Sequence, residues 1–433
     1  METSAERYLI DEHIMPPPIA SRRILRIRVI HYIVRGVQLE AESELSQFVA
    51  LAERGHQVTC FVARTPQSRN IDLTARGLKL ETVLLRRLVP VVSYIFFEFM
   101  ACLRLIRSLA RYDGVILDVY SVPFLFPVLL ALRLCSPSRA LLLRIDTVPV
   151  ETVGLLASLQ WSFFHTLSTK LAATLFDKIL CISPMMCELY LRQFGIPEEK
   201  MGVWPSAVNT DLFVPVSISK ANRLRKELGI STKCVVLYHG LLSRARGIMQ
   251  MVEAFGILKQ KGVDATLVLL GDGPAREEIR RYVQANHLDD VVLVCGPVDY
   301  AQVPDYIGAC DAGIVALPDN PWWRYQCPTK VLECLAMNKP LIVSDIPAHR
   351  WIIGSAPVAL YLKGTGSQEI ARGIRTFIAT RHTLEPSLGR QIASSFSMAK
   401  IAQMLEGEVL SVILRAASRS KMQTVANSQD FHS

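Results

Sequence analysis

The sequence predicts an α/β protein with two Rossmann-like, doubly wound parallel-sheet domains that face each other across a cleft. Three observations support this fold class. The chain has 433 residues, more than one hydrophobic core usually organises. Half of the residues are apolar, enough for two cores. Short apolar runs alternate with amphipathic segments, as buried parallel strands alternate with the helices that cover a sheet on both faces.

In the first half, "ILRIRVIHYIV" predicts a strand that Gly36 breaks. "LEAESELSQFVALAERG" predicts the helix that follows, and Gly55 suits the left-handed position at its end. "HQVTCFVA" then predicts the second strand, which completes a βαβ unit. "YDGVILDVY", "ALLLRID" and "FDKILCIS" predict further strands of the same sheet.

The second half repeats this alternation. "CVVLYHG" leads into the predicted helix "GIMQMVEAFGILKQKG", and "ATLVLLGDG" leads into "PAREEIRRYVQ". "VVLVCG", "VPDYIGACDAGIVAL" and "PLIVS" predict the remaining strands. Ligands of open α/β sheets bind outside the carboxyl ends of the strands, so the loops after these strands are the candidate site.

Composition sets the expected boundaries. The polar, irregular stretch around "NTDLFVPVSISKANR" suits a linker, and the pattern becomes helical after Thr380. We expect an N-terminal tail over 1–23, a first domain over 24–213, a linker over 214–232, a second domain over 233–394, a C-terminal helix over 395–418 that could return to the first domain, and a flexible tail over 419–433.

Charge and cysteine usage limit the environment and the partners. The net charge of +9 suits a nucleotide, a nucleic acid or an anionic membrane surface, or serves solubility alone. Ten scattered cysteines without a CxxC pair or zinc-type spacing indicate reduced thiols in a cytosolic protein. The first twenty residues carry acids where a secretory signal would be basic and then apolar.

Two apolar regions are too short to predict a membrane-spanning helix. Glu98 interrupts "VPVVSYIFFEFMACLRLI", and "VYSVPFLFPVLLAL" ends before Arg133. Core or interfacial packing is the simpler interpretation. Because Arg104, Arg107 and Arg111 follow the first region, a peripheral membrane contact stays open.

The segment "CPTKVLECLAMNKPLIVSD" carries the strongest local signal of a site. Lys330 falls in the first turn of the predicted helix, although the positive end of a helix favours acids. If Pro328 is the first helical residue, the following amides and Lys330 form an anion site. Glu333 lies one turn further and could accept hydrogen bonds from two vicinal hydroxyls, which is the layout of a nucleotide. The alternative is a surface Lys–Glu pair of little energetic weight.

Two more loops at strand ends favour the nucleotide interpretation. In "HGLLSRARGI" the predicted strand ends at Gly240, and Arg244 and Arg246 follow, whose planar guanidinium groups match phosphate. The alternative is a pair of solvated loop arginines. In "GDGPAREE", Gly271 and Gly273 would allow close backbone approach, a weak signal by itself.

These motifs resemble, in order and spacing, those of a known family. "YHG…RARGI", "VLLGDGP", "VCGPV…VPDYIGACDAGIVAL" and "CPTKVLECLAMNKPLIVSD" are similar to the pattern of the GT-B glycosyltransferases, in particular the retaining group numbered family four, or glycosyl transferases group one. The first half matches more loosely through "YIVRG…LAERGHQVT", "DKILCIS" and "VWPSAVNTDLFVP".

The resemblance implies that the second domain binds a nucleotide-sugar donor and the first domain the acceptor. Arg246 and Lys330 would contact the diphosphate, Glu333 the ribose hydroxyls, and the segment Gly296 to Val298 the base. The expected donor-binding residues are Gly36, Gly240, Arg244, Arg246, Gly271, Gly273, Pro297, Val298, Tyr325, Thr329, Lys330 and Glu333, and the expected catalytic residues are Arg246, Lys330 and Asp146.

Three positions depart from the family pattern. Tyr325 stands where the first of two paired glutamates contacts the transferred sugar, and Leu241 where many members have an arginine. Asp146 stands near the place of a catalytic histidine, while His165 in "WSFFHTLS" is interpreted as a packed histidine.

Four further residues have open interpretations. Trp322 and Trp323 could stack on a sugar or anchor their loop. For His349 and Arg350 we favour a capping or surface role over substrate contact.

The expected function is therefore retaining transfer of a glycosyl unit, of hexosyl type, from a UDP- or GDP-sugar to a glycan or lipid-linked hydroxyl. The absence of an Asp-x-Asp pattern predicts that no metal is required, and we expect no cofactor and no nucleic-acid partner. The expected location is the cytoplasm, including the inner face of the membrane. A GT-B nucleotide-sugar epimerase and a non-catalytic nucleotide-sugar-binding scaffold are the alternatives.

Overall fold

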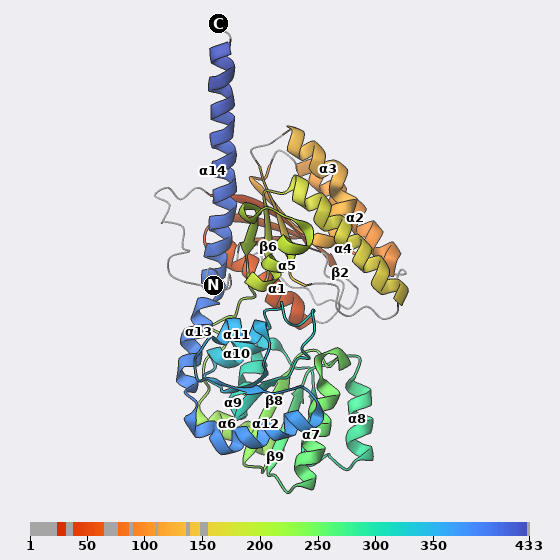
Figure 1. The fold of residues 1–433 in the computed structure, drawn as a ribbon, viewed down its shortest axis with the longest axis vertical. Helices are drawn as coiled ribbons and strands as arrows, with labels where there is room; N and C mark the ends of the chain where they lie inside the picture. Colours follow the sequence, from red (N-terminus) through yellow and green to blue (C-terminus); the bar gives the residue numbers. More distant parts are fainter. Residues whose placement is uncertain are drawn as a thin grey trace. The chain divides into compact units, whose positions relative to one another are not determined.

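The computed structural model describes residues 24–31, 38–64, 77–85, 90–108, 111–135, 139–147 and 155–430. The chain divides into two compact units (Figure 1). The first unit comprises Met1–Pro205 and Ala399–Ser433, and the second comprises Ser206–Met398. Each unit is a parallel sheet flanked by helices, so the predicted α/β class with two doubly wound sheets is confirmed.

Among the described residues of the first unit, seven parallel strands pair in the order β3-β2-β1-β4-β5-β6-β7. β4 and β5 are apolar and almost wholly buried, as expected of strands covered on both faces. The strands are β1 (Arg26–His31), β2 (Gln57–Arg64), β3 (Leu78–Leu84), β4 (Gly114–Asp118), β5 (Ala140–Ile145), β6 (Lys178–Cys181) and β7 (Met201–Val203). β3 and β7 were not predicted from the sequence.

The helices of the first unit connect these strands. They are α1 (Gln38–Glu53), α2 (Pro90–Ser108), α3 (Val122–Cys135), α4 (Leu155–Leu175) and α5 (Pro184–Phe194). Gly55 follows α1 with φ +95°, the left-handed conformation that its position predicts. Figure 1 shows α2, α3 and α4 side by side on one face of the sheet, and α3 packs against both of the others.

The last helix, α14 (Met398–Asp430), belongs mainly to the first unit. Arg54 Nε donates to Glu406 Oε2 at 2.7 Å, and Val409 packs on Gly114 of β4. The helix continues well beyond the predicted end at residue 418, through most of the range expected to be a flexible tail.

All residues of the second unit are described, and its six parallel strands pair in the order β10-β9-β8-β11-β12-β13. This is the Rossmann strand order, in which the chain reverses its direction of winding between β8 and β11. β8 and β9 are buried at every position. The strands are β8 (Cys234–His239), β9 (Ala265–Leu270), β10 (Val292–Gly296), β11 (Ala312–Val315), β12 (Leu341–Ser344) and β13 (Ala359–Leu362).

Helices surround this second sheet, and their apolar faces form its core with the strands. They are α7 (Ile248–Gln260), α8 (Arg276–Ala285), α9 (Val303–Ala309), α10 (Thr329–Ala336), α11 (Pro347–Ile353), α12 (Ser367–Thr380) and α13 (Gly389–Ser395). The range 214–232, expected to be a linker, instead contains helix α6 (Ile218–Glu227), which packs on α9 within this unit. Arg225 of α6 also pairs with Asp311 at 3.0 Å.

Candidate functional site

Lys330 and Gly240 meet where the winding of the second sheet reverses. Gly240 ends β8 with φ +109°, and α10 begins after the loop that follows the neighbouring strand β11. A Cβ atom at Gly240 would lie 2.8 Å from Lys330 Nζ. The ammonium group therefore lies against the backbone at the end of β8, 5.5 Å from the Tyr238 ring centroid. This is the position at which open α/β sheets bind ligands.

The start of α10 suits an anion. The structure corrects the predicted position of Pro328, which is the N-cap residue, while Thr329 is the first helical residue. Proline offers no side-chain acceptor, so no side chain caps the first amides, and the first turn contains no acid. The positive end of the helix dipole and the Lys330 ammonium thus both attract an anion to the start of α10.

Glu333 is a buried carboxylate with both oxygens engaged. It is 4% exposed, His239 Nε2 lies 2.7 Å from Oε2, and the Tyr300 hydroxyl donates to Oε1 at 2.7 Å. Burial raises the pKa of Glu333, but the hydrogen bonds from His239 and Tyr300 and the charge of Lys330 outweigh burial and hold the pKa below 4.5. Glu333 is therefore an ionised acceptor at neutral pH.

Sequence reasoning missed His239 and Tyr300. The signal for His239 was its place as the last residue of the predicted strand "CVVLYH", directly before Gly240. Tyr300 lies outside the regular strands, and its ring packs edge-on against Phe213 at 5.4 Å. Its contact with Glu333 joins residues 33 positions apart, which local patterns do not reveal.

Gly271 and Gly273 of "GDGP" allow the loop after β9 to pack closely against the loop after β8. A Cβ at Gly271 would collide with the carbonyl oxygen of Gly240, and one at Gly273 would collide with the backbone of Leu242. Leu242 N donates to Asp272 O at 2.8 Å, and Ala275 N donates to Leu242 O at 3.0 Å. The close approach that the sequence predicted is thus explained by the neighbouring loop of the chain itself, which fixes the backbone next to Lys330.

Arg246 is held by Trp323. Its guanidinium carbon lies 5.0 Å from the Trp323 ring centroid, and the indole N–H donates to Ala245 O at 2.9 Å. Trp323 is 6% exposed, which makes it an anchor of the arginine loop, whereas Trp322 is 42% exposed. Arg244 is directed toward α8, where it makes a two-pronged ion pair with Glu278.

The segment predicted to lie beside a base follows β10. Gly296 has φ +78°, and a Cβ there would lie 2.9 Å from Nη2 of Arg276. Pro297 is exposed and Val298 is half-buried. Arg276, from the first turn of α8, therefore lies against this segment. The sequence contained it in "GDGPAREE", but the prediction did not use it.

Two of the three positions that depart from the family pattern carry neither an acid nor a cation. Tyr325 and Leu241 are both half-buried, and the Leu241 carbonyl accepts from the Tyr238 hydroxyl at 2.9 Å. His349 is fully buried, with Nδ1 2.8 Å from the Ser344 carbonyl oxygen. Arg350 makes a bidentate pair with Asp345.

In the first unit, Asp146 lies just beyond the end of β5 and is paired with Arg144, Nε to Oδ1 at 2.6 Å. The Arg144 side chain is buried, 4.7 Å from the Trp204 ring centroid. His165 is a packed histidine, 6% exposed and hydrogen-bonded to the Tyr190 hydroxyl. Gly36 lies outside the described residues.

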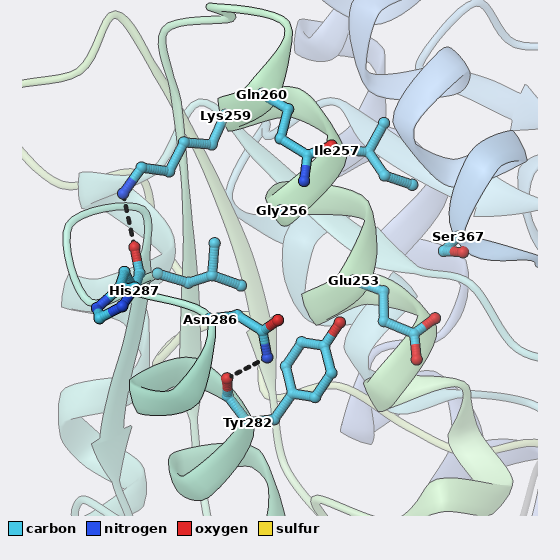
Figure 2. A pocket seen from close by; sticks show the side chains of 10 residues that line it. Glu253, Gly256, Ile257, Lys259, Gln260, Tyr282, Asn286, His287 and Ser367 are labelled. Atoms are coloured by element: carbon cyan, nitrogen blue, oxygen red, sulfur yellow. Dashed lines mark hydrogen bonds between the residues drawn. The ribbon is translucent and has the colours of Figure 1, made fainter.

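The described part of the chain presents no metal centre beside these residues. It contains no cluster of three or more His, Cys, Asp or Glu side chains arranged to hold a metal ion. A surface groove of about 570 Å³ lies between α7 and α8, lined by residues such as Glu253, Lys259 and Tyr282 (Figure 2). None of the residues that line it belongs to the predicted site. Most of its lining comes from α7, the end of α8 and the loop after α8, and Ser367 begins α12.

Similarity to solved structures defines the class of fold. Anabaena Alr3699/HepE, in complex with UDP and glucose, matches with a TM-score of 0.68 at 16% identity over 89% of this chain and 99% of that one. Sucrose-phosphate synthase from Thermosynechococcus elongatus matches with a TM-score of 0.71 at 20% identity over 91% and 100%. The two-sheet architecture is thus the GT-B fold.

Family models then identify the family. "Glycosyl transferases group 1" matches residues 220–391, and "Glycosyltransferase Family 4" matches residues 48–212. Together the two models cover most of both units. The chain belongs to the group 1 glycosyltransferases of GT-B fold, as the motifs predicted.

Curated relatives match over shorter stretches of the chain, at higher identity than the solved structures. Alpha-D-kanosaminyltransferase of Streptomyces kanamyceticus is 26% identical over 188 residues, 42% of this chain and 47% of that protein. The GDP-mannose-dependent alpha-(1-6)-phosphatidylinositol dimannoside mannosyltransferase of Mycobacterium tuberculosis is 26% identical over 180 residues, 42% and 45%. Alpha-monoglucosyldiacylglycerol synthase of Streptococcus pneumoniae is 26% identical over 230 residues, 51% and 50%. The chain spans about half the length of the curated relatives it matches.

Proposed function

We propose that this chain transfers a hexosyl unit from a UDP- or GDP-sugar to an acceptor hydroxyl, with retention at the anomeric carbon. The observation that carries the proposal is the convergence of Lys330, Gly240 and Glu333 at the carboxyl edge of the second sheet. A cation at a helix start followed by a buried carboxylate one turn later fits a diphosphate followed by a ribose.

In this proposal the donor bond between the anomeric carbon and the β-phosphate oxygen breaks, the acceptor oxygen replaces the phosphate, and the leaving diphosphate takes up the proton of the acceptor hydroxyl. Negative charge grows on the leaving diphosphate. Lys330, Arg246 and the first amides of α10 neutralise that charge without reorganising, which is how preorganised sites lower a barrier. Glu333 accepts hydrogen bonds from the ribose hydroxyls, and Thr329, Gly271 and Gly273 shape the backbone around the phosphates.

Several residues complete the proposed donor site. Pro297 and Val298 lie beside the base, with Arg276 as the neighbouring cation. Tyr325 contacts the transferred sugar in place of the family's glutamate. In the first unit, Asp146 serves the acceptor, oriented by its pair with Arg144. Arg244 contributes only if the donor displaces Glu278.

We further propose that the acceptor is a glycan or a lipid-linked glycan and that the protein works at the cytoplasmic surface of a membrane. Two of the relatives reported above are named for phosphatidylinositol dimannoside and diacylglycerol products. No helix in the described ranges combines the length and apolar character needed to cross a bilayer. Peripheral association is the form of contact that we propose.

A donor screen with and without acceptors tests this function. The proposal predicts release of nucleoside diphosphate that depends on acceptor, and activity that persists in EDTA. Sugar isomerisation without acceptor would instead indicate an epimerase, and tight donor binding with neither reaction would indicate a scaffold. Loss of turnover in EDTA that magnesium restores would contradict the metal-free mechanism.

The variant Glu333→Ala gives the matched test of the donor site. Removing an ionised hydrogen-bond acceptor costs about 1.5–3 kcal/mol of binding, so the donor KM should rise roughly tenfold or more. Unchanged donor affinity would remove Glu333 from the site. Glu253→Ala, in the groove of Figure 2, is the control and should leave the donor KM unchanged.

A further inference from the structure

The outer surface of α2 is apolar where a surface helix is normally polar. Val92, Ile95, Phe96, Phe99 and Ile106 are 50%, 51%, 42%, 59% and 49% exposed. Their spacing of three, four and seven residues places them on one face of the helix. Single exposed apolar residues need no explanation, but a continuous stripe marks an interaction surface.

The opposite face of α2 is buried, and the charged residue on that face is Glu98. Glu98 is 1% exposed and accepts from the Ser121 hydroxyl at 2.8 Å, next to Phe97 and Ala101, which are fully buried. α2 thus has its acid inside and two of its three phenylalanines, Phe96 and Phe99, outside. The exposed apolar residues of α2 therefore do not serve to fill the core.

The apolar surface continues over the two neighbouring helices. Leu130 and Leu134 of α3 are 38% and 74% exposed, and Phe163 and Phe164 of α4 are 64% and 39% exposed. α3 packs on both α2 and α4, and Figure 1 shows the three helices as one layer. We call the nine exposed apolar side chains of α2, α3 and α4 the apolar helix face.

The charges around this face have one sign. The sequences of the three helices contain a single acid, the buried Glu98. Arg107 in the last turn of α2 and Arg111 just beyond it are exposed, and so is Lys170 of α4. In a symmetric dimer through this face, copies of these cations would approach one another without acids to balance them. An anionic lipid surface accepts both the aromatic side chains and the cations.

We propose that the apolar helix face binds the surface of a bilayer containing anionic phospholipids, with Phe96, Phe99 and Phe163 in the headgroup region and Arg107 and Arg111 at lipid phosphates. The inference rests on the proposed function, because it supplies the route by which a glycosyltransferase reaches a lipid-linked acceptor. It adds the surface and the lipid class, which the function alone does not specify.

Vesicle co-sedimentation of the full chain tests the inference. The probes are vesicles of phosphatidylcholine alone and of equal parts phosphatidylcholine and phosphatidylglycerol. We expect at least about tenfold stronger binding to the anionic vesicles, weakened by salt. Phe96→Ser with Phe99→Ser should lower this binding by about tenfold or more, because the apolar contact is lost. Arg107→Gln with Arg111→Gln should remove most of the preference for anionic lipid.

Two controls keep the test decisive. Ile218→Ser removes an apolar side chain that is 79% exposed on α6 of the second unit and should leave vesicle binding unchanged. Thermal unfolding of each variant checks that it is folded. We expect all of them to fold, because the replaced side chains are on the surface. Equal vesicle binding by the wild type and the Phe96/Phe99 variant would overturn the inference. So would a dimer in solution that this variant dissociates while no vesicle binding occurs.

Nucleoside diphosphate binding, measured on the same samples, separates this inference from the proposed function. The Phe96/Phe99 variant should bind UDP or GDP as the wild type does. Nucleotide binding without vesicle binding would contradict the proposal that the apolar helix face binds a membrane, but not the proposed function. Vesicle binding without nucleotide binding would contradict the proposed function alone.

Discussion

The two units share their first six strands in the same order, yet they bury groups of opposite charge near the carboxyl edge of the sheet. In the second unit the carboxylate of Glu333 is buried between His239 and Tyr300. In the first unit the guanidinium of Arg144 is buried beside Trp204 and paired with Asp146. The same topology therefore supports different chemistry, and function depends on the side chains at the strand ends.

Their helices differ as well. α8 of the second unit reads "REEIRRYVQA", with charged residues outside and Ile279 and Val283 buried, as expected of an amphipathic surface helix. α2 of the first unit presents apolar side chains outward. Our proposals accordingly assign a small polar ligand to the second unit and a larger apolar partner to the first.

Among the described glycines, Gly271 of the second unit has the closest backbone neighbour, and Gly271→Ala should have the largest effect. Its Cβ would collide with the Gly240 carbonyl oxygen, so the loop pair must open. We expect a loss of at least about 3 kcal/mol in the free energy of unfolding. Gly262→Ala is the control, with φ +68° but no atom within 4 Å, and should cost about 1–2 kcal/mol. Equal losses in urea unfolding would contradict the packing argument.

Each unit also contains a buried neutral histidine. Burial lowers the pKa of His165 in the first unit and of His349 in the second to about 4, from 6.5. Because the folded pKa is lower than the unfolded one, stability is full above pH 6.5 and falls between pH 6.5 and 4. The loss is on the order of 3 kcal/mol for each residue.

The variants His165→Gln and His349→Gln separate the two contributions. Each should flatten the pH dependence of the unfolding free energy over this interval, whatever its effect at pH 7. An unchanged slope for either variant would show that the histidine in that unit has the same pKa in the folded and unfolded states.

His239→Gln sharpens the description of the Glu333 site. Loss of the imidazole hydrogen bond should weaken nucleoside diphosphate binding by about tenfold, corresponding to roughly 1–1.5 kcal/mol. Burial then dominates the pKa of Glu333, which should rise, so binding should be lost at a higher pH on acidification. Tyr300→Phe should act in the same direction. Weaker binding without a change in its pH profile would make both residues structural only.

Trp323→Ala should have the smallest effect. It removes the ring beside Arg246 and should weaken nucleoside diphosphate binding about three- to fivefold, near the 0.5–1 kcal/mol of an ordinary cation–π contact. Trp322→Ala is the control, since this exposed neighbour could contact only the sugar, which the diphosphate lacks. An equal effect of both substitutions would contradict the assignment of Trp323 as the anchor of Arg246.

Local patterns were enough to predict the fold and the placement of Lys330 and Glu333 on one helix. Lys330 and Glu333 lie one turn apart on one helix, so their shared face could be inferred from spacing. The contact between His239 and Glu333 joins residues 94 positions apart, and strand pairing alone does not indicate which side chains meet. The same applies to Arg244, whose pairing with Glu278 became visible only in the structure. The role of Pro328 was wrong by one position because helix starts depend on backbone angles.

The linker prediction shows a further limit. "SISKANRLRKE" is polar, and polarity alone suggested an irregular connection. The structure forms a helix there because Ser217 caps it, accepting a hydrogen bond from Lys220 N at 3.4 Å. A capping residue was present in the sequence, but no apolar periodicity drew attention to it.

The most direct test of the account compares diphosphate with monophosphate. Calorimetry should show that the wild type binds UDP or GDP more tightly than the corresponding monophosphate, and that Lys330→Met loses most of this difference, about tenfold or more. Because the monophosphate is the internal reference, general damage to the site would weaken both ligands equally. A Lys330→Met variant that keeps the full preference for the diphosphate would contradict the claim that this cation binds a pyrophosphate.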